Sequence, residues 1–446
     1  MQKSVALVVV LACCMIIPPF AVNSSVTAGD TPSARTYNVI LLIGDGMGIE
    51  HIDLTRMCTV GEHEKLNVDY LDDDPGWVAT ISLDGVTDSA AAGTALATGY
   101  KTQNHMVSVL PDGTVLETVL ERAEKIGKST GLVSSVYLED ATPAVFCSHT
   151  DDRGDYAYIA EKMAYSGVDV LLGSGEGYFV PKGEPMGQRL DGRNIIGEMQ
   201  GLGYDFVETR EELNSADVDG GKLLGFFGGL SAQTYMLDRE VSTNEPTLSE
   251  MTSKAIEVLD QNEKGFFLMV EGGAIDWVSH NRDPAGVVAD TFEFDKAVGV
   301  ALAFARADHG GTLVLVTADH ECGGLQVDED VNAKYVKGIT ATTEFMWGKI
   351  ESDEMSYKSA MSSYANIQRL TKNEMKCIEL YGEGGISDVI SARANVEWGW
   401  SGMDNGEHTD ALVPVYAYGP NSDQFDGELD NTDIGQLMFI SLSGSW

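Results

Sequence analysis

Four short apolar runs, each followed by polar or glycine-rich residues, constrain the fold of this chain more than any other feature of its sequence. They span residues 39–43, 130–136, 266–270 and 312–317, and helical stretches separate them. This alternation is typical of a mostly parallel sheet that is covered by helices on both faces. Because the ligands of open α/β sheets bind beyond the carboxyl ends of the strands, we predict an α/β fold whose functional residues follow these runs.

The segment from about residue 325 to residue 405 differs from its surroundings. It is rich in Met, Ser, Glu and Tyr, and it has helix-like spacing around residues 354–380. We therefore predict a catalytic domain over residues 29–446 that carries an inserted subdomain at about 325–405.

The charge of the chain excludes two classes of partner. Its 446 residues include 29 basic and 69 acidic ones, which gives a formal net charge of −40. Nucleic acids and anionic membrane surfaces are polyanions and would be repelled, so no nucleic-acid partner is expected. The hydrophobic share of 43% is nevertheless enough for a sizeable core, so the chain is expected to be globular.

The first 28 residues are predicted to be a signal peptide. Lys3 precedes an apolar stretch over residues 5–22, and the small residues of 26–28 offer a cleavage site before Gly29. The protein is therefore expected to be exported, as a periplasmic, cell-surface or secreted protein, with no stable membrane span after cleavage. A retained membrane anchor is the alternative, because the apolar stretch is barely long enough to cross a bilayer.

Cysteine usage leaves the disulfides open. Outside the predicted signal peptide the chain has Cys58, Cys147, Cys322 and Cys377. Four cysteines allow three pairings in an exported protein, and their spacing matches no zinc cluster, so no pairing is assigned.

Two glycine- or alanine-rich motifs place a carboxylate and a hydroxyl where a metal and a phosphate can bind. Asp45 stands between glycines after the first apolar run, so a metal can approach it without side-chain crowding. Ser89 follows Asp88 where an alanine-rich helix is expected to begin, and the unpaired N–H groups of a helix start attract phosphate. Each motif alone has a simpler interpretation, because Asp and Gly are ordinary turn residues and Ser89 or Asp88 can merely cap the helix.

Acidic residues and histidines follow the runs at 266–270 and 312–317, and one more histidine precedes a further apolar run at 412–417. They are Glu271, Asp276, His280, Asp319, His320 and His408. Asp276 and His280 are four residues apart, so on a helix they share one face and can grip one metal. Carboxylates and imidazoles together are the ligands that zinc and magnesium select. Each segment taken alone is also consistent with side chains that simply face solvent.

The ordered motifs resemble those of the alkaline phosphatase family. They are GDGMG, TDSAAAGTA, ATPA, EGGAID, TADH and GEHT, and the resemblance extends from about residue 38 to residue 420, outside the interior of the predicted insertion. It implies an enzyme that hydrolyses phosphate monoesters through a phosphoserine, with two Zn²⁺ and one Mg²⁺ per chain as cofactors.

The resemblance also implies a role for each matching residue. Ser89 takes the place of the phosphorylated nucleophile. The expected ligand sets are Asp276, His280 and His408 for one zinc, Asp45, Asp319 and His320 for the other, and Asp45, Thr142 and Glu271 for magnesium.

The family's phosphate-clamping arginine matches Arg153, which Asp88 would steady. A guanidinium suits this role because its planar fork can donate two hydrogen bonds to phosphate oxygens. From the sequence alone, a surface ion pair between Arg153 and Asp151 or Asp155 is the alternative.

One position departs from part of the family. Some members have lysine where this chain has Trp277, and that lysine faces the residue matching Asp140. Asp140 is therefore expected to lack its usual cationic partner here, which puts the affinity for the third metal in doubt.

Small phosphate monoesters are the expected substrates. The predicted insertion resembles the variable crown-like segments with which some members form homodimers, so a homodimer is expected.

Other functions are alternatives to this interpretation. A phosphodiesterase of the same superfamily would share the metal ligands and is one alternative. An exported protein that binds phosphate or metal without turnover is another. A sulfatase would need a modifiable Cys or Ser in a C/S-x-P-x-R setting, and Ser89 is followed by alanines instead.

Overall fold

A computed structural model describes most of the chain beyond its N-terminal segment. The described residues are 38–72, 74–217, 221–229, 233–241, 244–308, 311–399 and 407–443. The predicted signal peptide at 1–28 lies outside them, as do residues 400–405 of the predicted insertion.

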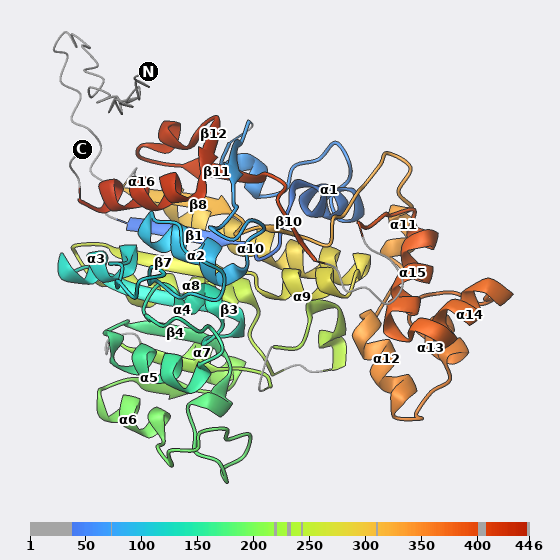
Figure 1. Ribbon diagram of the computed structural model, residues 1–446, viewed down its shortest axis with the longest axis horizontal. Helices are drawn as coiled ribbons and strands as arrows, with labels where there is room; N and C mark the ends of the chain where they lie inside the picture. Colours follow the sequence, from blue (N-terminus) through green and yellow to red (C-terminus); the bar gives the residue numbers. More distant parts are fainter. Residues whose placement is uncertain are drawn as a thin grey trace, which may run out of the picture. The chain divides into compact units, whose positions relative to one another are not determined.

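A ten-stranded sheet forms the centre of the fold, in the order β12-β2-β11-β8-β1-β7-β3-β4-β6-β5 (Figure 1). Its strands are β1 (Asn38–Ile43), β2 (Gly76–Ala79), β3 (Ser129–Tyr137), β4 (Val170–Ser174), β5 (Asp205–Val207), β6 (Leu223–Phe226), β7 (Phe266–Glu271), β8 (Thr312–Thr317), β11 (Val413–Tyr418) and β12 (Glu428–Asp430). Strand β11 runs antiparallel to its neighbours β2 and β8, and the other pairs are parallel. The predicted mostly parallel α/β sheet is thus confirmed.

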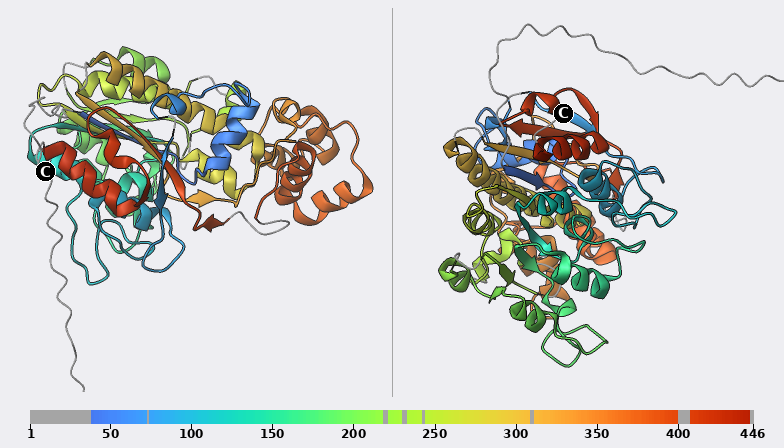
Figure 2. Two further views of the ribbon diagram at one scale, coloured as in Figure 1. Left: turned by 90° about the horizontal axis from the view of Figure 1, so that it is seen from above. Right: turned by 90° about the vertical axis from the view of Figure 1, so that its left-hand side faces the viewer.

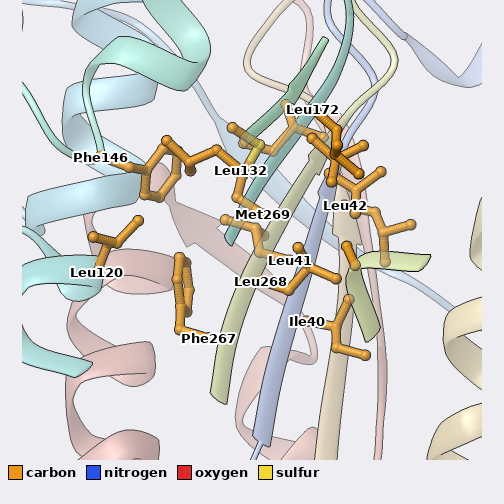
Figure 3. Packing of buried hydrophobic residues seen from close by; sticks show 14 of the residues in the cluster. Ile40, Leu41, Leu42, Leu120, Leu132, Phe146, Leu172, Phe267, Leu268 and Met269 are labelled. Carbon is orange, nitrogen blue, oxygen red and sulfur yellow. The ribbon is translucent and has the colours of Figure 1, made fainter. Parts of the chain in front are cut away.

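The central strands β1, β7 and β8 are buried along their whole length. Strands covered on both faces consist of continuous apolar residues rather than alternating ones, and that pattern marked them in the sequence. Figure 3 shows the side chains of Leu41, Leu268 and Met269 within this core. The rings of Phe146 and Phe267 have centroids 5.8 Å apart at its edge.

Helices cover both faces of the sheet (Figure 2, left). On one face, helix α10 (Pro284–Ala307) contacts α8 (Leu248–Leu259) and α1 (Ile49–Cys58). On the other face, α2 (Ser89–Thr98) contacts α3 (Val119–Lys125), α4 (Ala141–Ala144) and α16 (Asn431–Ser443). The remaining helices of this part are α5 (Tyr156–Ser166), α6 (Ile195–Gly201), α7 (Arg210–Ser215), α9 (Ala274–His280) and the 3₁₀ helices η1 (Val68–Tyr70), η2 (Glu176–Tyr178), η3 (Met236–Val241) and η4 (Ser422–Phe425). None of the described helices is long and apolar enough to cross a membrane.

Five helices follow one another within the predicted insertion. They are α11 (Ala333–Val336), α12 (Thr343–Glu351), α13 (Tyr357–Ser363), α14 (Lys372–Tyr381) and α15 (Glu383–Ala394). The helix-like spacing around 354–380 corresponds to two helices, because the side chain of Thr371 caps a new helix by accepting a hydrogen bond from the backbone N–H of Glu374. An apolar cluster that includes Met346, Ile378 and Ile386 holds these helices together and extends to α1 and α10.

Candidate active site

The acidic residues and histidines that follow the central strands come together at one edge of the sheet. Strand β1 lies between β7 and β8, with Ile43 opposite both Glu271 and Thr317. Because these strands are parallel, the residues after their carboxyl ends are neighbours. Gly46 fits this crowded edge with a φ of +68°, and a Cβ there would lie 2.7 Å from Asp276 Oδ1.

One group of ligand atoms combines Asp276 and His280 from α9 with His408 from the short strand β10 (His408–Thr409). The helical spacing predicted for the first two residues is confirmed, and His280 Nε2 lies 3.2 Å from Asp276 Oδ2. His408 Nε2 lies 3.3 Å from His280 Nε2 and 3.6 Å from Asp276 Oδ1. The Nδ1 atom of His408 is 2.9 Å from the carbonyl oxygen of Thr87, which orients Nε2 toward the group.

A second group lies beside the first and shares Asp276 with it. It consists of Asp45, Asp276 and His320, whose ligand atoms all lie within 4.8 Å of one another. His320 Nε2 is 3.6 Å from Asp45 Oδ1 and 3.1 Å from Asp319 Oδ2. The rings of His320 and His408 stack with centroids 3.5 Å apart, so the two groups form one continuous site.

Ser89 begins helix α2 at this site. Its Oγ lies 3.4 Å from His320 Nε2, and the residue is buried. The preceding Asp88 caps the helix, because its Oδ1 accepts a hydrogen bond from the N–H of Ala91 at 2.9 Å. The capping role considered for Asp88 is therefore present, and it leaves the Ser89 hydroxyl beside the histidine and carboxylate groups.

The residues expected to hold magnesium lie around the far side of Asp45. Thr142 Oγ1 donates to Asp45 Oδ2 at 3.2 Å. Ser134 Oγ donates to Glu271 Oε2 at 2.5 Å, whereas Glu271 Oε1 is buried with no hydrogen-bond partner among the described residues. Thr142 and Glu271 can thus each offer an oxygen next to Asp45.

Arg153 is held by two carboxylates. Its Nη1 donates to Asp88 Oδ2 at 3.2 Å, and its Nη2 donates to Asp140 Oδ1 at 3.0 Å. Burial opposes its charge, yet Asp140 and Asp88 together raise the pKa of the Arg153 guanidinium above its ordinary value. These two residues hold Arg153, rather than the Asp151 or Asp155 of the alternative interpretation.

Asp140 therefore has a cationic partner in this chain, because Arg153 pairs with it at 3.0 Å. The Trp277 ring instead packs near the Tyr137 ring, with centroids 5.8 Å apart and a tilt of 57°. Position 277 thus offers Asp140 no cation, and Arg153 is the cation that pairs with Asp140.

The electrostatics of the site favour a bound cation. Burial, with Asp319 and other carboxylates nearby, raises the pKa of Asp45 well above its usual range, and burial beside Asp140 raises the pKa of Glu271 to about 8. Burial near Asp276 also raises the pKa of Asp319 to about 6. So many buried carboxyl groups without countercharge are costly, and a divalent cation relieves that cost.

The donor set also fits metal ions. Asp45 Oδ1, Asp276 Oδ1 and Glu271 Oε1 are buried and have no hydrogen-bond partner among the described residues. Burial opposes the ionisation of Asp276, but the imidazoles of His280, His408 and His320 hold its pKa below the ordinary value. An ionised carboxylate between imidazoles is a suitable ligand set for zinc.

Sequence reasoning missed one member of this site. Cys322, on the short strand β9 (Glu321–Cys322), joins Asp276, His280 and His408 in the first group of possible ligands. Its position two residues after His320 is the signal that the sequence offers, but the spacing of the four cysteines matches no zinc cluster.

Comparison with known protein families identifies the family to which this chain belongs. The family model for alkaline phosphatase matches residues 36–443. The chain belongs to the alkaline phosphatase family. It is therefore an enzyme, a phosphoric monoester hydrolase, as the order of its motifs predicted.

Relatives across bacteria support this membership. Alkaline phosphatase 4 of Bacillus subtilis is 37% identical over 432 residues, with 91% of this chain and 88% of the relative covered. The crystal structure of the cold-active alkaline phosphatase from the psychrophile Shewanella sp. aligns with a TM-score of 0.79 at 31% identity, covering 91% of this chain and 99% of the other. The structure of the Thermus thermophilus alkaline phosphatase aligns with a TM-score of 0.82 at 26% identity, covering 93% of each chain.

Proposed function

We propose that this alkaline phosphatase hydrolyses phosphate monoesters through a phosphoserine at Ser89. The observation that carries the proposal is the position of Ser89 Oγ, 3.4 Å from His320 Nε2 at the start of helix α2. The N–H groups of a helix start favour an anionic phosphate. The proposed nucleophile Ser89 therefore lies beside a candidate metal ligand, His320, and at a helix start whose N–H groups can bind phosphate.

Two zinc ions and one magnesium ion are the proposed cofactors. The ligands are Asp276, His280 and His408 for one zinc, Asp45, Asp319 and His320 for the other, and Asp45, Thr142 and Glu271 for magnesium. When bound, the metal ions supply Lewis acidity and positive charge to the oxygens of the phosphoryl group. The first group of donor atoms contains all three residues of the first zinc set. The second group contains Asp45 and His320 of the other set but has Asp276 in place of Asp319, whose Oδ2 lies 3.1 Å from His320 Nε2. The buried carboxylate oxygens without hydrogen-bond partners among the described residues also support bound cations.

Arg153 is the proposed phosphate clamp. Asp88 and Asp140 hold its guanidinium from two sides, so it is oriented before substrate binds. An arginine that is already fixed loses little conformational entropy when it donates two hydrogen bonds to phosphate oxygens. Arg153 therefore binds and orients the substrate and does not take part in proton transfer.

The reaction has two displacements at phosphorus. The Ser89 hydroxyl releases its proton to solvent, and its oxygen forms a bond to phosphorus while the bond to the alcohol oxygen breaks. The alcohol leaves after it takes up a proton. Water then attacks the same phosphorus, the bond to Ser89 Oγ breaks, and Ser89 regains a proton as inorganic phosphate departs.

Export and homodimer formation are further parts of the proposal. Export rests on the sequence of residues 1–28, which has the charged, apolar and small-residue regions of a signal peptide. Dimer formation rests on the resemblance of the inserted segment, which contains helices α11 to α15, to the variable crown-like segments with which some family members build their dimer contact.

The test of the proposed function compares two substrates under two metal conditions. Phosphate release from an aryl phosphate monoester and cleavage of the matching aryl diester are measured before and after treatment with a chelator, and again after zinc and magnesium are restored. We expect rapid monoester hydrolysis, much slower diester cleavage, and a loss with chelator that added metal reverses. Preference for the diester would show that the protein is a phosphodiesterase, and no turnover of either substrate would contradict catalysis.

A further inference from the structure

Cys322 lies directly opposite a proposed metal ligand. Strands β9 and β10 pair in antiparallel register, with Cys322 opposite His408 and Glu321 opposite Thr409. Side chains of directly opposite residues in an antiparallel pair lie on the same face of the ribbon. The pairing therefore places the Cys322 sulfur on the same side as the His408 imidazole.

The surroundings of Cys322 fix its side chain within the site. The residue is fully buried, and its backbone N–H donates to the carbonyl oxygen of Gly46 at 2.9 Å. Its Sγ is 3.8 Å from the carbonyl oxygen of Asp276 and lies within 4.8 Å of the ligand atoms of Asp276, His280 and His408. A Cβ on Gly46 would lie 2.8 Å from Cys322 Cβ, so glycine at position 46 is required for this approach.

An independent observation also points to a cation at this place. Asp276 Oδ1 is buried and has no hydrogen-bond partner among the residues the structure describes. Asp276 is only 7% exposed, so water does not readily satisfy this oxygen. A metal ion at the centre of the four side chains would satisfy the oxygen and the sulfur together.

We propose that Cys322 is a sulfur ligand of the metal ion held by Asp276, His280 and His408. This inference rests on the proposed function, because it concerns the same ion. Binding of the metal releases the thiol proton to solvent, and the thiolate completes a set of two nitrogens, one oxygen and one sulfur.

The two metal sites consequently differ in chemical softness. The second group, Asp45, Asp276 and His320, contains no sulfur among its described members. Thiolates favour zinc, cobalt and similar ions over magnesium, whereas carboxylates also accept magnesium. Cys322 therefore makes the first site the more selective of the two against magnesium.

Cobalt provides the direct test, because a thiolate bound to Co²⁺ gives an intense charge-transfer absorption in the near ultraviolet. The full enzyme is stripped of metal, reloaded with Co²⁺, and compared with Cys322→Ser and the control Cys377→Ser. Cys377 lies in helix α14 and belongs to neither group of possible ligands. We expect the band in the wild type and in Cys377→Ser, and its loss in Cys322→Ser.

Metal affinity gives a second readout. Loss of a partner that merely supports a ligand typically costs about 10–100-fold in metal affinity. We expect Cys322→Ser to weaken zinc binding at the site of Asp276, His280 and His408 by at least about 10-fold in competition with a chromophoric chelator, with Cys377→Ser unchanged. X-ray absorption of the zinc-loaded wild type should show one sulfur at about 2.3 Å, a measurement that remains available if Cys322→Ser fails to fold.

The two proposals fail in different ways. Wild-type cobalt enzyme without the charge-transfer band, or zinc enzyme without a sulfur neighbour, would overturn the role of Cys322 while monoester hydrolysis continued. If instead His280→Ala left the bound cobalt unchanged and the wild type hydrolysed no monoester, the proposed metal site itself would be wrong.

Discussion

Arg153 donates a hydrogen bond to Asp140 at 3.0 Å, and this pair joins the proposed phosphate clamp to helix α4, where Thr142 lies. Asp140 also accepts from the N–H of Ala141 at 2.7 Å, so one carboxylate fixes both the arginine and the start of the helix. Asp140 therefore connects the proposed phosphate clamp to the helix that carries Thr142, a proposed magnesium ligand. A change of charge beside Asp140 is expected to affect phosphate binding.

The substitution Trp277→Lys adds such a charge. A lysine amine near Asp140 would attract both that carboxylate and the bound anion, and an added interaction of roughly 1 kcal/mol corresponds to about fivefold tighter inhibition by inorganic phosphate. Phosphate inhibition constants of wild type, Trp277→Lys and the uncharged control Trp277→Phe are compared at fixed salt and magnesium. Unchanged or weaker inhibition in Trp277→Lys, relative to Trp277→Phe, would show that position 277 does not face the phosphate.

An ion pair whose arginine is buried joins the inserted helices to the segment after α9. Arg282 follows helix α9, which ends at His280. Its side chain is 3% exposed and pairs with Asp388 of helix α15. Arg282→Ala leaves a partly buried carboxylate without this partner, so we expect a loss of about 2–4 kcal/mol in the free energy of unfolding. Urea denaturation followed by circular dichroism measures it.

The matched control for this prediction is Arg393→Ala. Arg393 pairs with Glu374 at 2.7 Å, but its side chain is 39% exposed, so the expected loss is about 0–1 kcal/mol. Equal effects of the two substitutions would contradict the structural importance assigned to the buried pair.

Stability at neutral pH is expected to depend on Asp290 in helix α10. Burial raises the pKa of Asp290 from 3.8 to about 7. Between these values the folded state holds a proton that the unfolded state has lost, so stability falls as pH rises from about 4 to about 7 and then stays at the lower level. Asp290→Asn removes this contribution, so its melting temperature should fall less over that range and exceed that of the wild type at pH 8.

Melting curves at half-unit pH intervals test this prediction. Glu263→Gln, in the turn before β7, is the control, because Glu263 is exposed and its substitution should leave the slope unchanged. A wild-type slope retained in Asp290→Asn would mean that other buried carboxyl groups cause the dependence.

The net charge of −40 predicts a response to salt. Repulsion among the acidic residues strains the compact state, and the screening length shrinks from about 30 Å at 0.01 M to about 3 Å at 1 M salt. We expect the melting temperature and the activity toward anionic monoesters to rise over this range. A flat or falling melting temperature in sodium chloride would contradict the prediction, and a neutral osmolyte at equal osmolality serves as the control.

The sequence was sufficient to predict the parts of the fold that depend on local patterns. The runs at 39–43, 266–270 and 312–317 correspond to β1, β7 and β8, because a strand buried on both faces is apolar throughout. The edge strands β5 and β12 were not predicted. Each has three residues and no fully buried apolar run, so its pairing depends on the neighbouring strand.

The same limit applies to the site. The spacing of Asp276 and His280 is a property of one helix turn and was predictable, whereas the partners of Arg153 come from α2 and the start of α4, far apart in sequence. Cys322 lies opposite His408 because β9 pairs with β10, which follows the predicted insertion. The position of Cys322 two residues after His320 is visible in the sequence, but its pairing with a strand so distant in the chain is not.

The most direct test of the central claim is to identify the residue that becomes phosphorylated. The enzyme is mixed with an aryl phosphate monoester, quenched in acid during turnover, and digested for mass spectrometry, with Ser89→Ala as the control that should keep its fold and its zinc but lose most turnover. The account predicts phosphate on the peptide that contains Ser89 and on no peptide of Ser89→Ala. Phosphate on a different residue, or wild-type rates of turnover in Ser89→Ala, would contradict it.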